Sequence, residues 1–129
     1  MGSGAIQLGE NVLERKLIFV SGPVSSDPYG CIPKAIAKFD ELWDEGWCPI
    51  LPQLSVFQNM FSEHEYEEWM EYFDAIISRC DALYRMEGDS FGADREVERA
   101  ERLGIPVFYE GMDTSICDLA HVAQLDRAT

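Results

Sequence analysis

The stretch Leu17-Ile18-Phe19-Val20-Ser21-Gly22-Pro23 decides the fold. Its first four residues are all apolar, and Ser21-Gly22-Pro23 ends the run. A strand that is apolar at every position is typical of a parallel sheet covered on both faces. The stretch therefore predicts a central strand at 17–20, with a loop directly after it.

The rest of the chain alternates between short apolar runs and helical patterns. Further strands are predicted near 48–51, 82–85 and 105–109, and helices near 32–45, 63–79, 92–103 and 116–123. Residues 53–62 are predicted to form a loop, after which Ser62 and Glu65 match a capping-box pattern. An alternating order of strands and helices predicts a parallel sheet with helices on both faces. We therefore expect a three-layer α/β sandwich whose parallel sheet has four or five strands.

The composition is typical of one soluble globular domain. The chain has 129 residues, of which 47% are apolar and 26% charged, and no apolar run approaches the roughly 18 residues that a membrane helix needs. We expect residues 1–15 to be a leader or a loose N-terminus and residues 16–129 to form the domain. No secretory signal is visible in the sequence, and no two of the four cysteines are spaced as a CxxC motif. These features favour reduced thiols and a cytoplasmic location.

The charge balance narrows the choice of partner. The chain carries 24 acidic and 10 basic side chains, for a net charge of −14. This balance argues against binding to nucleic acid or to an anionic membrane surface. It does not exclude one small anionic ligand held by backbone amides. The cysteines and the two histidines lack zinc-site spacing, so we expect no metal and no cofactor.

Two loops have residue types that suit a small ligand. Ligands of open α/β sheets bind beyond the carboxyl ends of the strands. The first loop is Ser21-Gly22-Pro23, and the second runs from Gly88 through Ser90, Gly92 and Ala93 into a predicted helix. Glycines permit close backbone approach, a serine hydroxyl can donate, and the free amides of a helix start attract an anion. The alternative is an ordinary strand–helix turn in which Ser90 only caps the helix.

Glu96 is the most informative single residue. On a helical wheel it falls in the apolar arc with Ala93, Val97 and Ala100, whereas the other charged residues of this helix fall outside it. Burying an unpaired carboxylate is costly, so such a residue is usually paired, placed at the surface edge or functional. Asp74 lies at the flank of the apolar face of the preceding helix. It could orient a ligand, or it could simply be solvated.

The residues around the two loops resemble the nucleoside 2-deoxyribosyltransferase-like superfamily, which includes nucleotide N-glycosidases and small uncharacterised phage and bacterial members. Residues 17–23 are similar to the first strand and substrate loop of that family. Residues 80–96, in which Ser90 and Gly92 precede Glu96, are similar to its second signature. The similarity covers roughly residues 16–110. It implies a flavodoxin-like or Rossmann-like sandwich, usually assembled as a dimer or a larger oligomer.

The resemblance also implies a reaction. Members of the family cleave or transfer at the N-glycosidic bond of a (deoxy)nucleoside or its 5′-monophosphate, with a glutamate nucleophile at the anomeric carbon. The serine-glycine loop holds the sugar or the 5′-phosphate, and the first loop lies beside the base. Carried over to this chain, the catalytic residues are Glu96 and Asp74, and the substrate-binding residues are Ser21, Gly22, Ser90, Gly92 and Ala93.

The chain departs from the family pattern at two places. The family aspartate before the third strand falls close to Phe73, and Asp74 is one residue away. The C-terminal Asn or carboxylate that transferases take from a neighbouring subunit has no clear counterpart after Tyr109. These departures favour simple glycosidic cleavage over transfer between bases.

Two other functions stay open. The chain could be a nucleotide-binding module without turnover, or an interaction protein that works through the acidic helix near 63–79. Glu96 discriminates between the functions, because neither alternative needs a carboxylate at that position. Trp69, Tyr72 and Phe73 crowd the acidic helix. We therefore expect a homo-oligomer, first of all a two-fold dimer, that uses this helix or its neighbour.

Overall fold

The core of the protein is one sheet of four parallel strands in the order β2-β1-β3-β4. The structure is a computed structural model that describes residues 15–114. The strands are β1 (Leu17–Ser21), β2 (Cys48–Ile50), β3 (Ala82–Arg85) and β4 (Val107–Tyr109). Phe19 of β1 lies opposite Ile50 on one side and Leu83 on the other. The predicted central strand and the parallel α/β sheet are confirmed.

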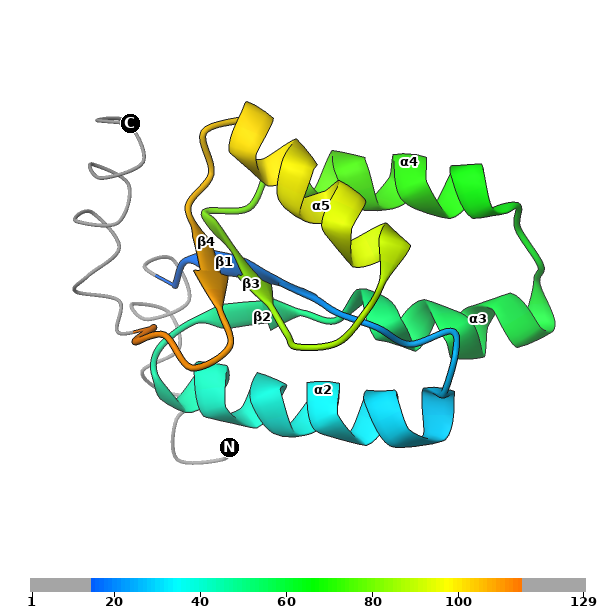
Figure 1. The fold of residues 1–129 in the computed structure, drawn as a ribbon, viewed down its shortest axis with the longest axis horizontal. Coiled ribbons are helices and arrows are strands. Elements are labelled where there is room, and N and C mark those ends of the chain that lie inside the picture. The colour runs from blue at the N-terminus through cyan, green and yellow to red at the C-terminus, as the bar shows by residue number, and fades with distance from the viewer. Residues whose placement is uncertain (1–14, 115–129) are drawn as a thin grey trace, which may run out of the picture.

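Helices cover both faces of this sheet. The structure has α2 (Pro28–Asp44), a short 3-10 helix η1 (Pro52–Leu54), α3 (Ser55–Phe61), α4 (Tyr66–Ile77) and α5 (Phe91–Arg102). Figure 1 shows α2 on one side of the sheet, α4 and α5 on the other, and α3 beyond the end of β2. The predicted helices near 32–45, 63–79 and 92–103 are confirmed, with shifted ends. The helix predicted near 116–123 lies outside the described residues.

The predicted loop at 53–62 is wrong, because the segment contains η1 and α3. The pattern of this short helix is hard to read because none of its residues is fully buried. One side of it borders a cavity, and Phe57 and Phe61 on the other side are 65% and 78% exposed. The predicted capping box at Ser62 is also displaced. The N-cap of α4 is Glu65, which exchanges side-chain and backbone hydrogen bonds with Glu68.

Alternate residues of β1 supply two separate cores. Ile18 and Val20 pack in the cluster that contains α2, and Phe19 packs in the cluster that contains α4 and α5. Because side chains of a strand alternate between its two faces, Ser21 points to the same side as Phe19. Arg85, at the end of β3, also reaches α5, where it pairs with Asp94. Because of the pleat of the strands, the side chains of Ser21 and Arg85 both point toward the first turns of α5.

The aromatic residues of α4 are divided between the core and the surface. Phe73 is buried in the core, and Trp69 stacks on it with ring centroids 5.9 Å apart. Tyr72 is 53% exposed. The large apolar side chains exposed around α3 are Leu54, Phe57, Met60 and Phe61. The homo-oligomer stays a prediction, and α3 joins α4 as a candidate surface for it.

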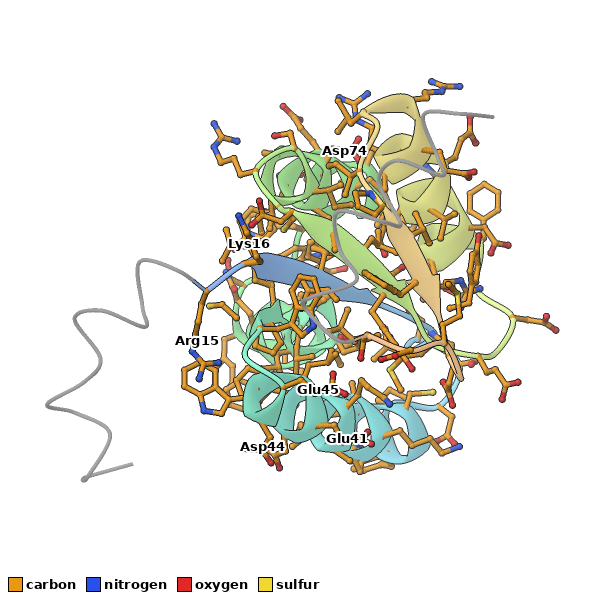
Figure 2. The ribbon with its side chains drawn as sticks, turned by 90° about the vertical axis from the view of Figure 1, so that its left-hand side faces the viewer. Arg15, Lys16, Glu41, Asp44, Glu45 and Asp74 are labelled. Carbon is orange, nitrogen blue, oxygen red and sulfur yellow. The ribbon has the colours of Figure 1, made fainter. Side chains whose placement is uncertain are left out.

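The chain around Arg15 and Thr114 is tied to the C-terminal end of α2. The Arg15 guanidinium lies 3.6 Å from the centroid of the Trp43 ring and donates to the Trp43 and Trp47 carbonyls. Trp47 in turn donates its indole N–H to the Thr114 carbonyl over 2.7 Å. Figure 2 shows Arg15 beside this end of α2, on the side of the sheet away from Asp74.

Candidate active site

A cavity of about 650 Å³ lies beyond the carboxyl ends of β1 and β3. The loop after β1 contributes Gly22 and Pro23 to its wall. The start of α5 contributes Ser90, Gly92, Ala93 and Glu96, and η1, α3 and α4 complete the wall. The two loops singled out in the sequence therefore border one cavity, at the edge where parallel sheets bind ligands.

The two loops also pack directly against each other. Gly88 has a φ of +118°, and a Cβ at this position would lie 2.8 Å from Cγ of Pro23. Only glycine combines this backbone conformation with so close an approach. Arg85 donates to the carbonyls of Met86 and Gly88 and forms an ion pair with Asp94. The second loop is thereby held between the end of β3 and the first turn of α5.

Glu96 is a buried carboxyl group on the wall of the cavity. It is 5% exposed, and one of its oxygens, Oε1, accepts a 2.7 Å hydrogen bond from Ser21 Oγ. The pKa of Glu96 is raised to about 7, mainly because the carboxyl group is buried. The hydrogen bond from Ser21 acts to lower this pKa, and the negative charge of Asp74 acts to raise it. The charges of Arg85 and Arg95 act to lower the pKa. Part of the Glu96 population is therefore ionised near neutral pH, and carboxyl groups perturbed in this way cluster at functional sites.

Ser21 lies behind the cavity wall and is fully buried. It does not border the cavity, so the expectation that it lies on the ligand surface is wrong. The physical reason is the pleat of β1, which turns the Ser21 side chain toward α5 and onto Glu96. The neighbouring Gly22 does line the cavity, as expected.

Asp74 also lies outside this cavity. It borders a separate groove of about 480 Å³ that residues of α4 and α5 line. On α4, the neighbouring Phe73 takes the position on the cavity wall, and Asp74 is turned away from it. Figure 2 shows Asp74 in the layer of α4 and α5. Asp74 and Glu96 therefore do not line the same cavity. Asp74 acts on Glu96 only at a distance, through its charge.

Ser90 combines both roles considered for it in the sequence. As the N-cap of α5, its Oγ accepts a 3.1 Å hydrogen bond from the Ala93 amide, and it also lines the cavity. The amides of Phe91 and Gly92 have no partner within the helix, because the first turn of any helix leaves its N–H groups unpaired. These amides and the helix dipole favour a negatively charged ligand group at this end of the cavity.

Replacing Ser90 by alanine is expected to lower the free energy of unfolding by about 1 kcal/mol, because α5 loses its cap. Urea denaturation of the variant and the parent measures this change. Ser25→Ala is the matched control, since Ser25 is an exposed serine on the same cavity. Equal stability of all three proteins would show that the Ser90 cap contributes nothing measurable.

Gln53 is a residue of the cavity that the sequence did not single out. It is 1% exposed, and its side-chain amide donates to the Val20 carbonyl over 3.0 Å. Its Oε1 is buried and has no hydrogen-bond partner among the described residues, although Gln53 lines the cavity. A buried acceptor without a partner is costly, so the site favours a ligand with an N–H or O–H donor. The signal in the sequence was its place just after β2, at the same edge of the sheet.

The described residues show neither a metal cluster nor a membrane span. No group of three or more His, Cys, Asp or Glu side chains within residues 15–114 is arranged to hold a metal ion. No helix in this part of the chain combines the length and the apolar character needed to cross a membrane.

No family model matches the chain, and no curated protein or solved structure gives a significant match.

Proposed function

We propose that the protein cleaves or transfers at the N-glycosidic bond of a (deoxy)nucleoside or nucleoside 5′-monophosphate, with Glu96 as the nucleophile. The observation that carries the proposal is the position of Glu96. Its carboxyl group is buried, yet it belongs to the wall of a cavity bounded by both loops that resemble the family's substrate loops. Within residues 15–114, Glu96 forms a hydrogen bond with Ser21 and no ion pair, and a buried carboxyl group in such a place is a strong functional candidate.

The proposed chemistry suits a carboxylate at this position. Breaking a C–N glycosidic bond builds positive charge at the anomeric carbon. An adjacent carboxylate stabilises that charge or traps the carbon in a covalent ester, as in retaining glycosidases. The leaving base takes the electron pair of the C–N bond, and water or a second base then displaces Glu96. The reaction requires the ionised form, so the rate should fall as the pH drops below about 7.

The polar groups of the cavity support a nucleotide-like ligand. The start of α5, with Ser90 and Gly92, suits the 5′-phosphate or the sugar hydroxyls. Gln53 Oε1 offers an acceptor to the N–H groups that nucleobases carry. Tyr66 and Trp69 of α4 also line the cavity and provide aromatic surface for a base.

A panel of nucleosides and 5′-monophosphates, incubated with and without a second base and analysed by chromatography, tests the proposal. Release of free base without an acceptor identifies a hydrolase, and exchange that needs an acceptor identifies a transferase. The Glu96→Gln protein, which keeps the shape of the side chain, serves as the inactive control. Binding of a panel member by calorimetry without any product would instead identify a nucleotide-binding module. If no member of the panel is bound or converted, the proposal is wrong.

A further inference from the structure

We propose that Ser21 is a positioning residue whose hydroxyl group keeps the Glu96 carboxyl hydrogen-bonded in both of its protonation states. The inference rests on the proposed function in so far as it assigns a use to Glu96. It gives Ser21 a role behind the cavity wall in place of the ligand contact that the resemblance implied.

The geometry around the hydroxyl group carries the inference. Ser21 Oγ lies 2.7 Å from Glu96 Oε1 and 3.4 Å from the carbonyl oxygen of Ala93. Ser21 is fully buried. A serine hydroxyl has one hydrogen to donate and can accept as well. It can therefore donate to only one of these two oxygens at a time.

The two choices correspond to the two states of Glu96. When Glu96 is ionised, the Ser21 hydroxyl donates its hydrogen to Oε1. When Glu96 is protonated on Oε1, the carboxyl group donates to Ser21 Oγ, and the Ser21 hydroxyl turns to donate to the Ala93 carbonyl. Rotation of one hydroxyl group thus satisfies both states in a buried place, where an unpaired polar group is costly.

The surrounding charges do not replace this hydrogen bond. Asp74 on α4, Arg85 on β3 and Arg95 on α5 act on Glu96 through their charge. Ser21 is the hydrogen-bond donor to the Glu96 side chain in the described part of the chain. Ser21 engages Oε1, and Oε2 accepts no hydrogen bond from the described residues.

The test follows the titration of Glu96 directly, in protein without ligand. Uniformly labelled glutamate allows the carboxyl carbon of Glu96 to be followed by NMR, with the signal assigned by its loss in Glu96→Gln. Ser21→Ala should raise the titration midpoint by about one pH unit, because the charge-assisted hydrogen bond lost by the ionised form is stronger than the neutral hydrogen bond lost by the protonated form. Ser21→Cys, which has a similar shape and a weaker donor, should give a smaller rise. Ser25→Ala should leave the midpoint where it is in the parent.

The outcomes separate this inference from the proposed function. An unchanged midpoint in Ser21→Ala overturns the role of Ser21, whether or not a substrate is found. If Ser21→Ala does not fold, an unchanged midpoint in Ser21→Cys has the same consequence. Conversely, a raised midpoint in a protein that converts no nucleoside supports the positioning role and rejects the reaction. Where a substrate is found, the acid limb of the pH–rate profile should move upward with the midpoint.

Discussion

Glu96→Ala is expected to lower kcat by at least about a thousandfold, with a much smaller change in the affinity for substrate. A nucleophile stabilises the transition state and contributes little to ground-state binding, so its loss falls on the chemical step. Steady-state kinetics with the substrate found in the panel, together with calorimetric binding of the same compound, measure the two effects separately.

A control variant on the same helix tests whether the removal of any negative charge lowers kcat. Glu101 is an exposed glutamate on the same helix, and Glu101→Gln should keep the parent kcat. Conversion of a confirmed substrate by Glu96→Ala at the parent rate would remove the mechanism and leave only the fold. A loss of activity in both variants would instead indicate that the net charge of α5 matters more than the nucleophile.

Glu96→Gln is expected to stabilise the folded protein at alkaline pH, by ~3 kcal/mol near pH 8. The folded state raises the pKa of this carboxyl from 4.5 to about 7. Folding therefore favours the protonated form, and the ionised form destabilises the native state. The loss of stability is absent when the pH is below the pKa of Glu96 in the unfolded state. It grows as the pH rises and reaches its full size above the pKa in the folded state. Glutamine has no charge to bury, so the variant avoids the penalty.

Urea denaturation of the parent and of Glu96→Gln at about pH 5 and about pH 8 measures this effect. The stability difference between the two proteins should be small at the lower pH and large at the higher one. Glu101→Gln again serves as the control, because its carboxyl is exposed. If Glu96→Gln were more stable than the parent by the same amount at both values of pH, titration of Glu96 would not be the cause of the stabilisation. A residue kept at such a cost fits a functional role.

The strands and the larger helices could be predicted from the sequence because their signals are local. Four apolar residues in a row at 17–20 can only be covered from both sides, and this condition leads to a parallel sheet flanked by helices. The inward position of Glu96 followed from helical periodicity, since its neighbours Ala93, Val97 and Ala100 are all buried. The segment at 53–62 was missed because α3 has no residue inside the core.

The residues of the site were predicted less completely than the fold. Gly22, Ser90, Gly92, Ala93 and Glu96 line the cavity as expected. Asp74 does not, because one residue along α4 rotates a side chain from the cavity to the neighbouring groove. Gln53 was overlooked because a polar residue in a segment expected to be a loop carries no local signal of burial.

The sequence by itself determined the elements that have a local cause: an apolar strand, the order of strands and helices, the loops at the carboxyl edge, and a carboxylate on the inner face of α5. The tertiary structure alone decided how these elements meet. Ser21 and Glu96 are far apart in the chain, and their 2.7 Å hydrogen bond depends on how β1 and α5 pack in three dimensions. The same packing buries Glu96 and raises its pKa. Burial and long-range contacts are properties of the assembled fold, and no pattern within one segment encodes them.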